Sequence, residues 1–191
     1  GAELPMTYEI LEVLKDWAKL NNGIPIHVNS DRNLYKDLLN QQNSTGQRFA
    51  SIPAFSENGG MVRRQCTKEY KIEPVIKTIR SIYGLKPRKR MPMTEVWLGI
   101  TMDEIERVKE SMLPRITYHY PLIDMRMRRS ECISFFKDRS FPVPPKSSCV
   151  FCPYHSNKNW KELKEKLPEE FDKAVKIDEA IRDSSKKGLK E

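Results

Sequence analysis

The sequence predicts an α/β fold in which helices flank a largely parallel sheet. Apolar residues recur at helical spacing in several segments of the 191 residues, and short runs rich in Val, Ile and Thr separate those segments. The order strand, helix, strand, helix is typical of parallel sheets with crossover connections. A hydrophobic fraction of 38% with 31% charged residues fits a chain that folds around a core and excludes a predominantly disordered one.

The N-terminal third predicts two helices separated by a strand. An amphipathic helix is expected over residues 7–20, because apolar side chains follow one another there at intervals of three and four residues. Thr7 is the residue type that caps such a helix. Residues 23–30 are rich in β-branched side chains and predict a short strand, and residues 33–42 predict a second, shorter helix.

The rest of the chain alternates helical segments with connectors. Pro74 is expected in the first turn of one helix, and Pro168 is expected to separate the last two. In chain order we expect a helix over 68–84, a basic proline-interrupted connector over 86–93, a strand over 95–101, a helix over 102–111, a helix over 125–138, a proline-rich loop over 141–156, and helices on either side of Pro168.

Two regions are expected from the change in composition after residue 112. Residues 1–112 predict an α/β core of nucleotide-binding type, and residues 113–191 predict a helical region that carries the cysteine motif and packs on that core. No apolar run approaches the roughly 20 residues that a membrane helix needs. The first residues also lack the pattern of a signal peptide, so a cytoplasmic location without a membrane partner is expected.

The chain is basic, with 34 Lys and Arg against 26 Asp and Glu and a formal charge of +8. This excess favours contact with nucleic acid or with nucleotide phosphates. Part of it is local, in residues 86–90 and 184–190. The alternative is that the charge serves solubility alone, and that the second cluster is a solvated tail.

Four cysteines are the strongest chemical signal in the sequence. Cys149 and Cys152 form a C-x2-C pair, and Cys66 and Cys132 lie upstream. Four thiolates complete a tetrahedral zinc site or the ligand set of an iron–sulfur cluster, and the spacing alone does not separate the two. Disulfides are not expected in a reducing compartment. The alternative is that the two upstream cysteines are ordinary buried thiols.

A candidate anion site lies next to Cys66. Arg63 and Arg64 precede this cysteine in a glycine-containing loop, and Lys71 follows it by one to two helical turns. Backbone amides with paired guanidinium groups are a good site for phosphate or sulfate. The alternative is a solvated, basic start of a helix.

Aromatic residues and a histidine complete the set of candidates. His155 is expected to lie beside the metal site rather than to bind the metal, because four thiolates already fill it. Trp17, Trp97 and Trp160 are expected to be packing residues. The Tyr118–Tyr120 run predicts a strand edge, with a stacking surface for a base as the alternative.

Several motifs extend over nearly the whole chain. The chain starts at the Gly of the motif Asp-Thr-Gly-x-x-x-Pro-Glu-Thr-Tyr, and a Pro-Leu-Ile-Asp segment precedes the cysteine loop. The matching residues are Gly1, Pro5, Thr7, Tyr8, Cys66, Lys71, Pro74, Pro121, Leu122, Asp124 and the segment KSSCVFCPYHS with the following Trp160. Together they resemble the phosphoadenosine phosphosulfate (PAPS) reductase-like family of the adenine nucleotide alpha hydrolase-like superfamily, in its four-cysteine bacterial and phage subgroup.

The resemblance implies a Rossmann-like parallel sheet flanked by helices. It also implies that Cys66, Cys132, Cys149 and Cys152 ligate a [4Fe–4S] cluster, with zinc as the alternative. Adenylylsulfate reductases of the wider family use a Cys-Cys pair with a C-x2-C. Here Thr67 stands at the second place of that pair, so Cys132 is expected to supply the remaining ligand.

The resemblance further implies a nucleotide pocket near the N-terminus. Gly1 and Glu3 are expected beside it, with ATP or another adenine nucleotide as the bound molecule. The first strand of the family and its Ser-Gly-Gly-x-Asp-Ser phosphate loop have no counterpart in these residues. We expect that the loop either precedes this sequence in the intact protein or comes from another polypeptide, and that this chain alone turns over little nucleotide.

Three functions follow from the resemblance and the charge. The first is an iron–sulfur, nucleotide-binding enzyme of transferase or oxidoreductase type that performs ATP-dependent sulfur transfer. Its expected acceptor is nucleic acid, and its expected partner is a sulfur donor protein. The second is a PAPS or adenylylsulfate reductase of sulfate assimilation, although the tail lacks the nucleophilic cysteine of such enzymes. The third is a zinc-stabilised nucleic-acid-binding module without catalysis.

Overall fold

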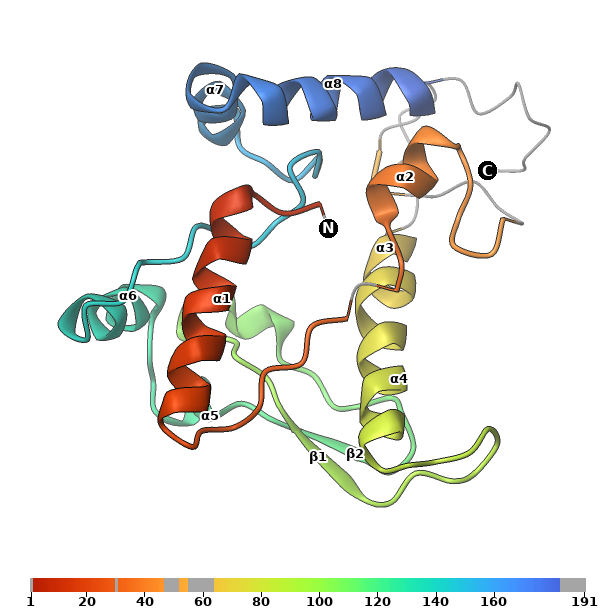
Figure 1. Ribbon diagram of the computed structural model, residues 1–191, viewed down its shortest axis with the longest axis vertical. Coiled ribbons are helices and arrows are strands. Elements are labelled where there is room, and N and C mark those ends of the chain that lie inside the picture. The colour runs from red at the N-terminus through yellow and green to blue at the C-terminus, as the bar shows by residue number, and fades with distance from the viewer. Residues whose placement is uncertain (1, 30, 47–51, 55–63, 183–191) are drawn as a thin grey trace. The chain divides into compact units, whose positions relative to one another are not determined.

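The computed structural model describes residues 2–29, 31–46, 52–54 and 64–182 of the chain (Figure 1). It divides into two compact units: unit 1 comprises Gly1–Ile79 with Pro144–Glu191, and unit 2 comprises Arg80–Val143. This division differs from the boundary expected at residue 112. The difference arises because the C-terminal helices pack on the N-terminal segment, which leaves the strands and their connections as a separate unit.

Unit 1 is helical in the described residues. Its elements are α1 (Pro5–Leu20), α2 (Leu34–Leu39), α3 (Gln65–Thr67), the π-helical turn η1 (Lys68–Ile72), α4 (Glu73–Ile82, whose last residues belong to unit 2), α7 (Asn157–Lys166) and α8 (Pro168–Ile181). Pro5 and Pro168 each stand at the start of a helix, where a missing N–H costs nothing. The expected separation of the last two helices at Pro168 is confirmed, whereas Leu4 rather than Thr7 is the N-cap of α1.

The hydrophobic core of unit 1 lies where α2 packs against α8 and α8 packs against α7. Leu38 is fully buried and Ile177 is 1% exposed. The complete core, called here the unit 1 core, consists of Leu34, Leu38, Ile52, Val150, Phe151, Ala174 and Ile177. It therefore joins the cysteine loop to helices from both ends of the chain, and Trp160 packs against it as expected.

Unit 2 contains the sheet. β1 (Thr94–Trp97) and β2 (Ile116–His119) pair in parallel, with Thr94 opposite Ile116 and Trp97 opposite His119. The 3₁₀-helix η2 (Met102–Arg107), α5 (Pro121–Asp124) and α6 (Arg129–Asp138) complete the described elements of this unit. The α/β class and the parallel pairing are confirmed, in a sheet of two strands.

Two expected elements are wrong. Residues 23–29 form no strand, and Ile24 is 87% exposed. This proline-containing run pairs with no other strand among the described residues, and a strand needs such a partner. The helix expected over 102–111 is a short 3₁₀-helix that ends at Arg107, and Glu104 inside it has non-helical dihedral angles. No helix among the described residues is long and apolar enough to cross a membrane.

The helix expected over 68–84 contains a π turn that its sequence explains. The N–H of Glu73 bonds to the carbonyl of Lys68, five residues back, instead of to Glu69. The next residue, Pro74, has no N–H to give. The carbonyl of Glu69 is therefore left without a helical partner, and the guanidinium of Arg32 donates to it while also pairing with the Glu73 carboxylate at 2.8 Å.

Further polar contacts attach the π turn to α2 and the residues after it. The Tyr70 hydroxyl donates to the Asp37 carboxylate at 2.6 Å, and burial together with this carboxylate raises the pKa of Tyr70 well above its usual value. The backbone N–H and the hydroxyl of Ser44 both donate to Glu69 Oε1, at 3.1 and 2.5 Å. These contacts fix the helical register of the residues that follow Cys66.

Replacing Arg32 by alanine is expected to lower the free energy of unfolding by about 1–2 kcal/mol, because the Glu69 carbonyl loses its donor. Lysine at this position is expected to retain part of the stability. The control is Lys77→Ala, which removes an exposed ion pair with Asp31 and is expected to cost less than about 0.5 kcal/mol. Urea unfolding followed by circular dichroism measures both, and equal losses in the two variants would contradict the proposed role of Arg32.

Candidate metal centre

The C-x2-C segment is a turn that the unit 1 core holds in place. The side chains of Val150 and Phe151, between the two cysteines, are 2% and 4% exposed. The backbone N–H of Cys152 donates to the carbonyl of Cys149 at 2.9 Å, which closes the turn. The N–H of Val150 donates to the carbonyl of Ala2 at 2.7 Å. The two thiols therefore stand on a backbone that is anchored by apolar burial and by the N-terminal segment.

His155 supports this turn from its C-terminal side. Its Nε2 lies 2.9 Å from the carbonyl of Cys149, and its backbone N–H donates to the carbonyl of Cys152 at 3.1 Å. The imidazole ring packs edge-on against Trp160 at a centroid distance of 5.0 Å. This geometry fits the expectation that His155 lies beside the cysteines and orients their backbone.

Cys66 lies in α3, directly before the π turn, and packs against the same core as Cys149. Cys66, Cys149 and Cys152 are close enough for their charges to interact. Burial raises the pKa of the Cys149 thiol to about 11; Lys71 acts to lower it, while Glu3, Cys152 and Cys66 raise it further. Cys66 and Cys149 thus pack against one core, and Cys152 closes the same turn as Cys149.

The electrostatics of this cluster favour a cation. Each additional thiolate or carboxylate near a half-buried thiol makes ionisation less favourable, and nearby positive charge opposes that effect. Lys71 supplies one positive charge to Cys149. A metal ion among the sulfur atoms supplies more, because a coordinating thiol is deprotonated by the ion that it binds.

The residues expected to contact anions lie beside the same cysteines. Glu3 is half-buried, and its carboxylate accepts a hydrogen bond from the Ser147 hydroxyl at 3.2 Å. Lys71, in the π turn, is exposed. Arg64 precedes α3, and its guanidinium lies 5.4 Å from the centroid of the Tyr154 ring, two residues after Cys152. The N-terminal segment, the helix of Cys66 and the C-x2-C turn therefore meet.

Thr67 adds an unsatisfied polar group to this place. Its Oγ1 is buried and has no hydrogen-bond partner among the described residues. A buried hydroxyl without a partner costs about 1–3 kcal/mol. From the sequence, Thr67 is only a departure from a Cys-Cys pair; the structure adds that its buried hydroxyl, on the residue after Cys66, has no hydrogen-bond partner among the described residues.

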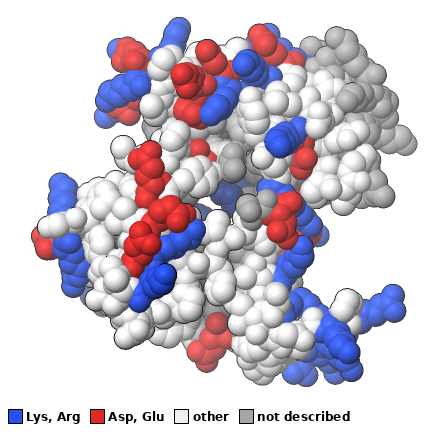
Figure 2. Space-filling model, viewed as in Figure 1, with Lys and Arg blue, Asp and Glu red and all other residues white. Residues whose placement is uncertain are grey.

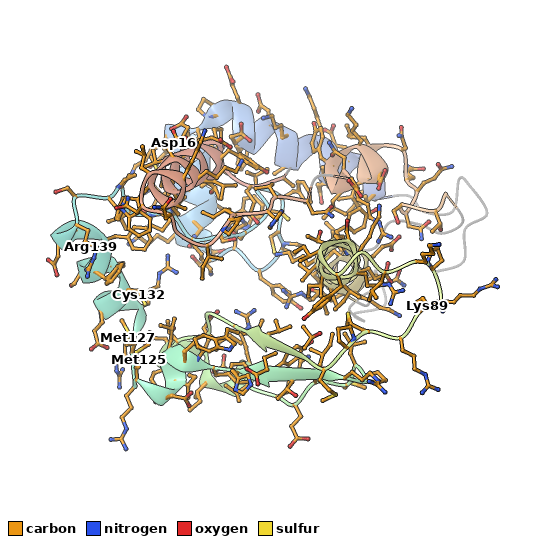
Figure 3. The ribbon with its side chains drawn as sticks, turned by 60° about the horizontal axis from the view of Figure 1, so that its bottom comes forward. Asp16, Lys89, Met125, Met127, Cys132 and Arg139 are labelled. Atoms are coloured by element: carbon orange, nitrogen blue, oxygen red, sulfur yellow. The ribbon has the colours of Figure 1, made fainter. Side chains whose placement is uncertain are left out.

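The remaining predicted residues lie in unit 2 or outside the described residues. Cys132 lies on α6 in unit 2, where Figure 3 labels it together with Met125, Met127 and Arg139 of the same unit. Gly1 and Arg63 lie outside the described residues. Among the described residues, no three His, Cys, Asp or Glu side chains are already arranged around a common point as metal ligands.

Sequence reasoning missed two neighbours of the site, Ser147 and Tyr154. Their only sequence signal is their position next to the C-x2-C pair, two residues before Cys149 and two after Cys152. Neither residue type by itself indicates a metal or an anion. Compared with known proteins, the chain matches no family model, no curated protein and no solved structure.

Proposed function

We propose that the chain is the cluster-bearing part of a PAPS reductase-like, iron–sulfur, nucleotide-binding protein with an adenine nucleotide alpha hydrolase-like fold. The observation that carries the proposal is that Cys66 and Cys149 pack against the unit 1 core, with Cys152 in the same turn as Cys149. Three thiols from two distant segments, next to Lys71, are an expected donor set for an iron–sulfur cluster or a zinc ion.

The residues present fit such a group. The three cysteines are half-buried and free of disulfides. Burial raises the pKa of the Cys149 thiol to about 11, so this thiol becomes a thiolate only when a bound cation deprotonates it. The buried Thr67 hydroxyl and the exposed Lys71 supply a donor and a positive charge for a negatively charged cluster. In the proposal Cys132 is the fourth ligand. When bound, a [4Fe–4S] cluster supplies an electron-transfer centre at this place.

The proposed activity of the intact protein is ATP-dependent sulfur transfer, to nucleic acid or to a smaller acceptor. In this proposal the adenine nucleotide or sulfonucleotide contacts Gly1, Glu3, Arg63, Arg64 and Lys71. If all four cysteines are ligands, none remains as a nucleophile. The sulfur then comes from a separate donor protein, and the reducing cytoplasm is the compartment that keeps the four thiols available.

A second candidate function is a zinc-stabilised nucleic-acid-binding module. The observation that favours it is the burial of Val150 and Phe151, because a cysteine turn that is part of the core is typical of a metal with a structural role. The net charge of +8 is compatible with a polyanionic partner. The identity of the bound metal separates this function from the first.

Lys71→Ala is expected to weaken the binding of ATP or adenylylsulfate to the full-length chain about tenfold or more, because a charge-assisted contact to phosphate or sulfate is lost. Lys68→Ala is the matched control, since Lys68 is an exposed lysine in the same π turn. Isothermal titration calorimetry at low salt measures both. Equal affinities of the two variants, or no binding by the wild type, would sink the nucleotide part of the proposal.

A further inference from the structure

Unit 2 carries a concentrated positive charge between α4 and β1. Lys86, Arg88, Lys89 and Arg90 are all exposed, and this stretch, called here the basic turn, forms the blue patch at the lower right of Figure 2. Figure 3 shows Lys89 on the connector before β1. None of the ion pairs within the described part of the chain involves these four residues.

The basic turn has a fixed conformation. The guanidinium of Arg80 donates to two of its carbonyls, from Nη1 to Lys89 and from Nη2 to Lys86, both at 3.0 Å. The N–H of Lys89 also donates to the carbonyl of Lys86 at 3.2 Å, and Arg88 takes a left-handed conformation with φ of 64°. The fold thus holds four like charges together, an arrangement that a bound polyanion stabilises.

An exposed aromatic surface lies on the strand that follows. Trp97, at the end of β1, is 70% exposed, so the expectation that it is a packing residue is wrong. Its ring lies 6.4 Å from the ring of His119, its partner in the parallel register of β1 and β2. The side chains of Glu95 and Thr117 share this face of the sheet and are exposed.

The basic turn and the sheet face that carries Trp97 favour different parts of a nucleic acid. The basic turn attracts phosphates, and Trp97 offers a flat ring on which a base can stack. Glu95 lies on the same face as Trp97, and its Oε2 is 3.7 Å from His119 Nε2. A carboxylate there disfavours phosphate, so a base rather than the backbone is the group expected at Trp97. A base is free to stack on a protein ring only where it is unpaired.

We propose that unit 2 binds single-stranded nucleic acid, with the phosphates on the basic turn and a base stacked on Trp97. The partner is defined by this combination of backbone charge and unpaired bases. The inference stands on residues of unit 2 alone and does not depend on a metal at the cysteines of unit 1.

The charge half of the proposal is tested with a fluorescein-labelled oligothymidylate of about 15 nucleotides and fluorescence anisotropy on the full-length chain. The double variant Lys86→Glu with Lys89→Glu is expected to bind at least about tenfold more weakly. The slope of log affinity against log salt concentration is expected to fall by about 1.4, or about 0.7 for each lost contact. The control, Lys166→Glu with Lys176→Glu, changes exposed lysines of unit 1 by the same charge and is expected to keep affinity within about threefold.

The stacking half is tested with Trp97→Ala and Trp97→Phe, which change a mostly exposed side chain and therefore leave the fold intact. Alanine is expected to weaken oligothymidylate binding about five- to hundredfold, and phenylalanine to retain most of the affinity. Duplex DNA of equal length is expected to bind more weakly than the single strand. Equal losses in the two double variants, no effect of Trp97→Ala, or preference for the duplex would each overturn the proposal.

Discussion

Cys149→Ser is expected to reduce the metal bound per chain to less than about a tenth of the wild-type amount. The oxygen of serine is a much poorer ligand for zinc or iron than a thiolate at this kind of site. Cys149 packs against the same core as Cys66 and shares the C-x2-C turn with Cys152. Cys66→Ser is expected to have the same effect. Metal analysis of the purified variants measures the loss.

The matched control for this prediction is Ser148→Ala. Ser148 precedes Cys149 in the same loop, so the variant perturbs the same backbone without removing a thiol. It is expected to bind as much metal as the wild type. If Cys149→Ser and Ser148→Ala retained the same amount of metal, the cysteines would be buried thiols of the core rather than ligands.

Leu38→Ala is expected to lower the free energy of unfolding of unit 1 by about 2–5 kcal/mol. Leu38 is fully buried at the centre of the unit 1 core, and its truncation leaves a cavity that the surrounding helices fill only in part. Cys66 and Cys149 pack against the same core, so the variant is also expected to bind metal more weakly. Urea unfolding followed by circular dichroism measures the first effect, and metal titration the second.

Leu39→Ala provides the comparison within the same helix. Leu39 is 40% exposed, so the same truncation is expected to cost less than about 1 kcal/mol. Both variants introduce the same residue into α2, which cancels differences in helix propensity. Equal destabilisation by the two variants would contradict the position of the core between α2 and α8.

The helices that the sequence predicts well are those with a long apolar face and a proline at the start. α1 ends at Leu20, as its apolar periodicity predicts, although it begins at Pro5 rather than at residue 7. α8 begins at Pro168, where the sequence predicts the separation of the last two helices. The parallel pairing of β1 with β2 follows from the order of elements. Residues 23–29 fail because a β-branched run becomes a strand only where another segment pairs with it.

The candidate site was predictable only in part. The C-x2-C pair is visible in the sequence, but the packing of Cys66 against the same core as Cys149 is a tertiary contact, and the π turn at Lys68–Ile72 follows Cys66 directly. That turn has a sequence signal in Pro74, yet Arg32 lies 37 residues before Glu69, whose carbonyl it bonds, and no local pattern connects them. The exposure of Trp97 is likewise a tertiary property, since strand propensity does not predict which face of the sheet is buried.

The most direct test of the central claim is the iron, sulfide and zinc content of the full-length chain purified without oxygen, together with its visible absorption spectrum. We predict about four irons and four sulfides per chain, as for a cubane cluster with cysteine ligands. One zinc per chain without sulfide would instead support the second candidate function, in which the metal has a structural role. A chain that retains neither metal, even after incubation with iron and sulfide or with zinc, would contradict a metal centre at Cys66, Cys149 and Cys152.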